Sequence, residues 1–211
     1  MAEGMLPAGT SSADLEEFIA HTLSREQSLS QALHEEAQVQ LEADALETAQ
    51  AMFVAYYART ADPAGLNYWS DQLVVTQGDT SAISQGFGDS EEFLAAYGGL
   101  DEVELITKLY QQLFARDPDQ GGLDFNANQL QTGAMAPADI AMAIAQGARG
   151  SDADLWQAKL AAADAVTRQL AQHDLMLKVY RGDLERSRGS LPTSNPARRS
   201  GIRRWKPWAM T

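Results

Sequence analysis

The sequence predicts an all-α protein built from two copies of a helix, a sharp corner and a second helix. Apolar residues recur at spacings of three and four along most of the chain. No stretch shows the sustained alternation that is typical of a strand. In addition, a short phrase of sequence occurs twice, at 57–68 and 114–125, with matched positions 57 residues apart. Self-similarity of this kind indicates a repeated structural unit.

The repeated phrase has the chemistry of a helix corner. Asp62-Pro63 is typical of a helix start, because the carboxylate accepts hydrogen bonds from free amides and proline has no amide to leave unpaired. A glycine three residues after the aspartate lets the preceding helix pass close, and an arginine at the end of that helix lies near its last carbonyl groups. The predicted structural motif comprises Arg59, Asp62, Gly65 and Trp69 in the first copy and Arg116, Asp119 and Gly122 in the second.

Start and stop signals divide the rest of the chain. Residues 14–23 are predicted to form a short helix, and Ser24 with Gln27 forms a capping box that would start a second one, from 25 to about 57. One long helix is expected from Ser151 to about residue 186, followed by a tail rich in Gly, Ser, Pro and Asn. Between these two helices, the stop signals are Gly78, Gly98-Gly99 and Gly133. The start signals are Asp79 or Thr80, Ser90, the capping box of Asp101 and Glu104, and Pro137.

These signals define five segments. The first half of the helix at 25–57 is polar on most faces, so it needs a partner to be stable in water. The predicted segments are an N-terminal helical segment at 1–42, the first repeat at 43–99, the second repeat at 100–155, a long C-terminal helix at 156–186 and a basic anchoring tail at 187–211.

The repeats resemble a bacterial domain of unknown function that occurs in tandem in secreted calcium-repeat and surface-layer proteins. Its pattern is a tyrosine, Gly-Arg, Pro-Asp, Gly-Leu and an aromatic pair, and the resemblance covers about residues 46–155. Ala61 stands where the family has proline, and Asn126 where it has tryptophan. The resemblance implies a fold and a habit of working in assemblies, without known catalytic residues. The matching residues are Tyr57, Arg59, Asp62, Gly65, Leu66, Tyr68 and Trp69, then Ser90, Glu91, Phe93, Tyr97 and Gly98.

Charge is segregated along the chain. Nine of the 16 basic residues lie at or after Lys178, where only Asp183 and Glu185 oppose them, so this end carries +7 and the rest −20. Without cysteine, neither disulfides nor thiolate chemistry contributes. No run approaches the length of a membrane span, and the N-terminus lacks a basic region followed by an apolar stretch. We therefore expect a protein made in the cytosol without a signal peptide.

The basic tail is the predicted partner-binding site. Arginine and tryptophan together suit docking into a pocket on an acidic protein, because both dominate binding hot spots. They suit equally a nucleic acid with its phosphates and stacked bases, and a third interpretation is a tail that only adds solubility. We favour docking onto other protein subunits, including copies of this chain, with nucleic acid as the alternative. The residues are Arg198, Arg199, Arg203, Arg204, Trp205, Lys206 and Trp208.

The three histidines do not indicate a catalytic or metal centre. Glu17 and His21 lie one helical turn apart, as metal ligands often do, but such pairs arise on any acidic helix. His34 and His173 stand apart from them, and the chain contains no Ser-His-Asp order, zinc motif or phosphate loop. We therefore expect no catalytic residues and no cofactor.

A calcium loop is only partly matched. Asp117, Asp119 and Gly122 fit its first, third and sixth positions. The fifth and twelfth positions hold Gly121 and Asn128, where oxygen ligands, and at the twelfth a bidentate glutamate, are required. A capped helix corner accounts for these residues better than a metal site does.

Together these features predict a non-catalytic structural subunit of a larger particle. A phage virion is the first choice, because the chain has no thiols, is expected to begin in the cytosol and carries a tail that needs a partner. A bacterial surface-layer or envelope-associated module, with glycan as the ligand that the resemblance implies, is the alternative. A small hydrolase ranks third.

Overall fold

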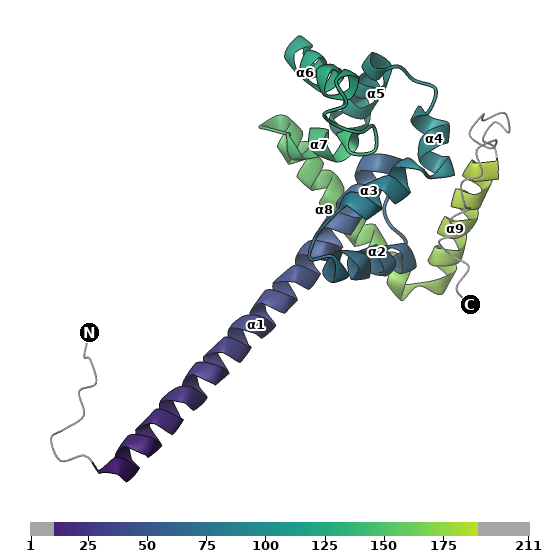
Figure 1. Ribbon diagram of the computed structural model, residues 1–211. Helices are drawn as coiled ribbons and strands as arrows, with labels where there is room; N and C mark the ends of the chain where they lie inside the picture. The colour runs from purple at the N-terminus through teal and green to yellow at the C-terminus, as the bar shows by residue number, and fades with distance from the viewer. Residues whose placement is uncertain (1–10, 190–211) are drawn as a thin grey trace. The chain divides into compact units, whose positions relative to one another are not determined.

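The computed structural model describes residues 11–189, which form nine α-helices and contain no strand (Figure 1). The predicted all-α class is confirmed. No helix in this part of the chain is long and apolar enough to cross a bilayer. The chain divides into two compact units, residues 1–43 and 44–211. The helices are α1 (Ser12–Tyr57), α2 (Pro63–Val75), α3 (Ser81–Gly88), α4 (Glu91–Tyr97), α5 (Glu102–Phe114), α6 (Gln120–Gln131), α7 (Ile140–Gln146), α8 (Ser151–Gln172) and α9 (Asp174–Gly189).

From residue 12 onward, the first unit consists of the N-terminal turns of α1. Ser11 and Asp14 start the helix, because the Asp14 carboxylate accepts from the Ser11 amide at 3.0 Å and the Asp14 amide donates to the Ser11 hydroxyl at 3.2 Å. The predicted break at Ser24 is wrong, since α1 runs through it. The Ser28 hydroxyl donates back to the Ser24 carbonyl at 2.9 Å, a bond that lets serine stay in a helix. Without glycine or proline nearby, the capping signal alone does not end the helix.

The core of the second unit is organised around the ring of Phe87 on α3. Phe53, Tyr56 and Tyr57, from the last turns of α1, surround it with centroid separations of 4.8–5.4 Å, and Tyr57 is stacked on it. Trp69 of α2 completes the cluster at 5.4 Å. Such aromatic contacts add to the free energy gained by burying the rings. The most deeply buried aliphatic side chains around this cluster are Met52, Leu73, Ile83, Ile106, Leu109, Leu113 and Ile140.

Matched positions of the two sequence copies have the same backbone geometry where the first helix of each copy ends. Ala58 follows α1 with φ +53°, and Ala115 follows α5 with φ +55°. Both residues are in the left-handed region, which ends a helix and turns the chain sharply. Each corner thus begins with the same turn, although alanine rather than glycine occupies it.

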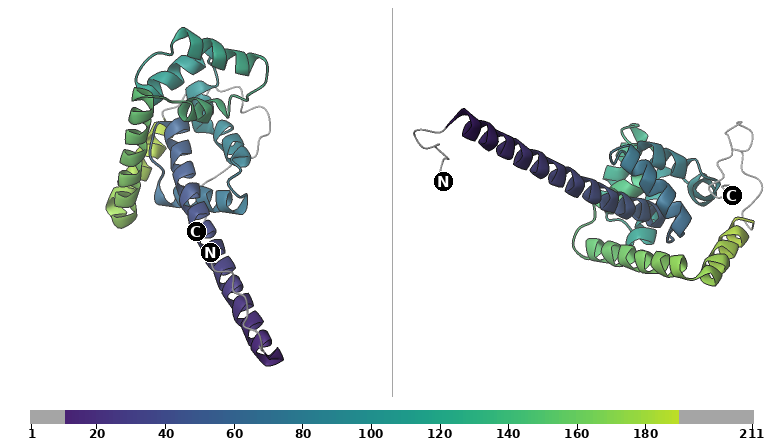
Figure 2. Two further views of the ribbon diagram at one scale, coloured as in Figure 1. Left: turned by 90° about the vertical axis from the view of Figure 1, so that its left-hand side faces the viewer. Right: turned by 90° about the horizontal axis from the view of Figure 1, so that it is seen from below.

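The C-terminal helix differs from the prediction. A single helix over 156–186 is wrong, because His173 has extended geometry (φ −134°, ψ +93°) and separates α8 from α9. The two helices lie at an angle to each other (Figure 2). The physical reason is tertiary, since Tyr180 and Arg181 of α9 bond to the first corner.

The helix after Pro137 begins later than predicted, because 137–139 form a turn and α7 begins at Ile140.

Candidate functional site

Asp62 is the centre of the first corner. It is the N-cap of α2, as the sequence predicts, and its Oδ1 accepts from the amides of Ala64 and Gly65 at 3.1 and 3.3 Å. The same oxygen lies 3.0 Å from Nη2 of Arg181, in an ion pair that sequence reasoning missed. Asp62 is fully buried, and its Oδ2 is without a hydrogen-bond partner among the described residues. The cap of the first corner is therefore closed over by α9.

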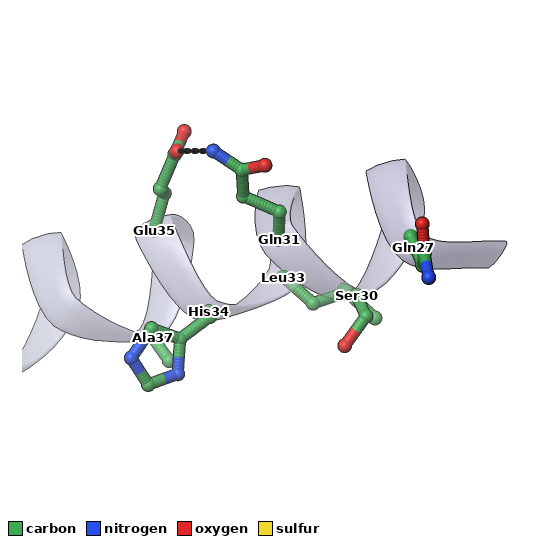
Figure 3. A pocket seen from close by; sticks show the side chains of 7 residues that line it. All are labelled: Gln27, Ser30, Gln31, Leu33, His34, Glu35 and Ala37. Carbon is green, nitrogen blue, oxygen red and sulfur yellow. Dashed lines mark hydrogen bonds between the residues drawn. The ribbon is translucent and has the colours of Figure 1, made fainter. Parts of the chain in front are cut away.

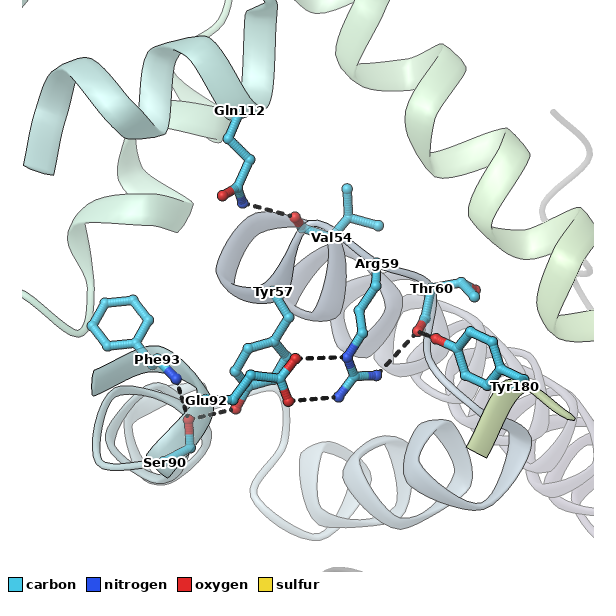
Figure 4. Close-up of polar contacts among 9 residues, drawn as sticks. All are labelled: Val54, Tyr57, Arg59, Thr60, Ser90, Glu92, Phe93, Gln112 and Tyr180. Atoms are coloured by element: carbon cyan, nitrogen blue, oxygen red, sulfur yellow. Dashed lines mark hydrogen bonds and ion pairs between the residues drawn. The ribbon is translucent and has the colours of Figure 1, made fainter. Parts of the chain in front are cut away.

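Arg59 lies beside this cap and pairs with Glu92 of α4 (Figure 4). Nε donates to Oε1 at 2.8 Å and Nη2 to Oε2 at 3.1 Å, so the pair is bidentate. The guanidinium also lies 5.1 Å from the ring centroid of Phe53 and 5.0 Å from that of Tyr57. Burial acts to lower the pKa of Arg59, but the hydrogen bonds and charge of Glu92, with a contribution from Tyr180, raise it above its ordinary value. Arg59 is thus held between α1, α4 and Tyr180 of α9 as a structural cation.

A buried polar network joins the first corner to α8 and α9. The Thr60 and Thr167 hydroxyl oxygens lie 2.6 Å apart, and the Gln50 amide donates to Thr60 Oγ1 at 3.0 Å. Thr167 also donates to the carbonyl of Ala61 at 2.8 Å. Tyr180 donates to the carbonyl of Thr60 (Figure 4). Because Gln50 and Thr167 are both buried, these bonds fix the relative position of the helices in the second unit.

The second corner repeats this chemistry in a more open form. Asp119 caps α6 by accepting from the Gly122 amide at 2.7 Å, and it is exposed where Asp62 is buried. Arg116 pairs in bidentate fashion with Asp152, with Nε and Oδ1 3.0 Å apart, and lies 5.3 Å from the ring centroid of Tyr110. Asp152 is the second residue of α8, and Glu92, which pairs with the arginine of the first corner, is the second residue of α4. A carboxylate is favourable in the first turn of a helix.

Both glycines of the motif lie against the preceding helix, as predicted. A Cβ at Gly65 would lie 3.1 Å from Cζ of Phe53, and one at Gly122 would lie 2.6 Å from the hydroxyl of Tyr110. Phe53 and Tyr110 are themselves matched positions, 57 residues apart. The aromatic ring and the glycine therefore fit together in the same way at each corner.

The Asp152 pair gives a prediction on pH. The hydrogen bond from Arg116 lowers the pKa of Asp152 below its ordinary 3.8, against a smaller raising effect of burial. The pair's stabilisation is therefore complete above pH 3.8 and is lost as the pH falls through the lowered pKa. Asp152→Asn should lower the free energy of unfolding by about 0.2–1 kcal/mol near neutral pH, because Arg116 is partly exposed.

This difference from the wild type should shrink as the pH falls below 3.8 and through the lowered pKa, as measured by urea unfolding at a series of pH values from 7 into this acid range. Asp154→Asn is the control, since Asp154 lies on the same first turn of α8 and has no ion pair with a described residue. A difference for Asp152→Asn that stays constant in acid would contradict the assigned role of the pair.

The two acidic residues of the partial calcium motif, Asp117 and Asp119, each accept hydrogen bonds from a different group. Asp117 accepts from the side-chain amide of Gln111 at 2.8 Å, whereas Asp119 caps α6. Asn126, which stands where the family pattern has tryptophan, donates its side-chain amide to the Gly122 carbonyl at 2.7 Å. Within residues 11–189, no group of three or more His, Cys, Asp or Glu side chains is arranged to hold a metal ion.

The depression shown in Figure 3 is lined by residues of α1 alone. Ser30 and Ala37 project to one side of the helix, whereas Glu35 projects to the other and accepts from Gln31 at 3.0 Å. A hollow bordered by one helix does not enclose a small ligand. His34 borders it, so this histidine lies on an exposed helix face.

The predicted partner-binding residues, from Arg198 to Trp208, lie outside the described part of the chain. The structure instead adds Tyr180 and Arg181, just before that tail, as residues that bind the first corner. No local signal marks them, because their partners lie about 120 positions earlier in the sequence.

One protein family matches the chain. Its description is "Domain of unknown function (DUF4214)", and it matches residues 84–149, about a third of the chain. The matched region begins within α3 and ends before α8, so it includes the second corner and leaves out the first. No curated protein and no solved structure matches the chain significantly.

Proposed function

We propose that the protein is a non-catalytic structural subunit that joins other protein subunits through its basic tail. The observation that carries this proposal is the segregation of charge, with +7 from Lys178 onward and −20 before it. Supporting it, the cations of both corners are engaged in contacts within the chain, Arg59 with Glu92 and Arg116 with Asp152. The arginines of the corners thus hold helices together, and the proposed partner contact rests on the basic residues of the tail.

Two forces would act at the tail. Charge alone would give a weak contact, because salt screens exposed charges over about 10 Å at 0.1 M. Trp205 and Trp208 would supply the buried area that makes the contact last. The acceptor would be an acidic surface on a neighbouring subunit, of the kind that this chain's own body offers.

Truncation after Gly189 tests the proposal. Because α9 ends at Gly189, the truncated chain keeps the nine helices of residues 11–189 and should unfold with an unchanged midpoint. It should fail to enter its particle, as measured by co-sedimentation with the assembled subunits. Normal assembly of the truncated chain would overturn the proposal.

The double variant Trp205→Ala and Trp208→Ala separates docking onto protein from binding to nucleic acid. It keeps every basic residue of the tail, so a contact that depends on phosphates would keep its salt dependence. Protein docking should weaken sharply in this variant and only mildly between 50 and 200 mM salt. A log-linear loss of affinity with salt, with little effect of the indoles, would favour nucleic acid.

The particle that we propose is a phage virion, in keeping with a chain that lacks cysteine and separates its charge. A bacterial surface layer or envelope is the second candidate, which the resemblance of the corners favours. Mass spectrometry of density-purified virions and of envelope fractions from the producing cells decides between them. Enrichment in the envelope fraction would exclude the virion.

A further inference from the structure

A narrow apolar stripe runs along the first unit. Leucine, isoleucine and alanine recur on one side of α1, where exposure runs from 39% at Leu15 to 65% at Leu33, and Leu41 at the C-terminal end of this side is half-buried. At 100° per residue, all members fall within an arc of about 80°. An exposed apolar surface of this kind, interrupted by two polar residues, is typical of an interaction site. The apolar stripe consists of Leu15, Ile19, Leu23, Leu33, Ala37 and Leu41, with Glu26 and Ser30 at its middle.

The spacing of the stripe is the same from either end. Between positions 15, 19, 23, 26, 30, 33, 37 and 41 the intervals are 4, 4, 3, 4, 3, 4 and 4. The pattern is therefore symmetric about residue 28. A second α1 running in the opposite direction would place Leu15 against Leu41, Ile19 against Ala37 and Leu23 against Leu33, which is the self-complementarity that a two-fold dimer requires.

We propose that the stripe binds the stripe of a second copy, antiparallel, with the two-fold axis at residue 28. The helix gains a partner, which a polar helix of this length needs in water. The inference rests on the proposed assembly role and names a second copy as one partner, but it does not involve the tail.

The central polar residues favour the antiparallel direction. In a parallel, in-register pair, Glu26 would face the Glu26 of the other copy, and two like charges would be partly desolvated together. In the antiparallel pair, Glu26 faces Ser30, whose hydroxyl can donate to the carboxylate. Among the other acidic residues, Glu17, Glu35 and Glu42 lie on the opposite side of the helix at 100° per residue, whereas Glu16 borders the edge of the stripe.

Engineered cysteines test the direction in the 211-residue chain, which has no thiol of its own. Leu15→Cys and Leu41→Cys chains should form a disulfide-linked dimer only when the two are mixed and oxidised. In the antiparallel pair, identical positions lie about 39 Å apart, at 1.5 Å per residue, so neither variant should cross-link with itself. Self-linking of each variant, read on a non-reducing gel, would show a parallel pair and overturn the proposal.

Sedimentation measures the strength of the pair. Leu23→Asp should raise the dimer dissociation constant about 100-fold or more, because two carboxylates would be buried without partners. Val39→Asp is the matched control, since Val39 is 66% exposed on the same helix but lies off the stripe. An equal effect of both substitutions would overturn the proposal.

The two proposals fail in different ways. A wild-type chain that is monomeric at micromolar concentration, but whose truncation after Gly189 blocks assembly, would exclude the α1 pair and leave the tail's role intact. A dimer that forms normally without the tail, in a chain that still enters its particle, would exclude the tail's role and leave the α1 pair intact.

Discussion

Asp62→Ala is expected to lower the free energy of unfolding by about 2–4 kcal/mol. The substitution removes the N-cap of α2 and at the same time the carboxylate that pairs with Arg181. Loss of a cap costs about 0.5–2 kcal/mol, and loss of a buried partner costs more because the remaining charge is left without one. Arg181 is 42% exposed, so water offsets part of that second cost. Urea unfolding followed by circular dichroism measures the change.

Asp119→Ala is the matched control for this effect. Asp119 holds the same position in the second corner, but it is exposed and caps α6 without a covering helix. Its replacement should cost only the cap, about 0.5–2 kcal/mol. Equal losses for Asp62→Ala and Asp119→Ala would mean that the contact with Arg181 contributes nothing to stability.

Leu109→Ala should cost about 2–5 kcal/mol, the range for a leucine removed from a rigid core. Leu109 lies on the inner side of α5 with no exposed surface, and its neighbours belong to several helices, so the cavity has little scope to collapse. The free energy of unfolding from a denaturant titration is the appropriate measure.

Val103→Ala on the same helix provides the comparison. Val103 is 48% exposed, so its truncation should change stability by no more than about 0.5 kcal/mol. A small effect of Leu109→Ala would show that the core around α5 is loosely packed, in contradiction to its complete burial.

The corners were predictable because their determinants are local. Asp62 and Asp119 cap helices through bonds that span two or three residues, and the capping box of Asp101 and Glu104 spans three. A side chain that acts on its own turn leaves its signal in a short window of sequence. The family match, at residues 84–149, includes the second of these corners.

Features that depend on distant residues could not be predicted. The side chain of Gln112 donates to the carbonyls of Val54 and Ala55 at 3.3 and 2.7 Å, and so satisfies the end of α1 from α5. The turn at His173 likewise follows from bonds that α9 makes to the first corner. Conversely, the signal at Ser24 is overridden, because the residues around it form helix readily and nothing near them ends it.

The bond between Asp62 and Arg181 also sets an order of events during synthesis. Arg181 leaves the ribosome 119 residues after Asp62, which takes about 6–24 s at 5–20 residues per second. In the second corner, Asp152 leaves the ribosome only 36 residues after Arg116, so this ion pair can form sooner. The corner that is made first is therefore completed last, because the Asp62 carboxylate has no Arg181 to pair with until α9 emerges.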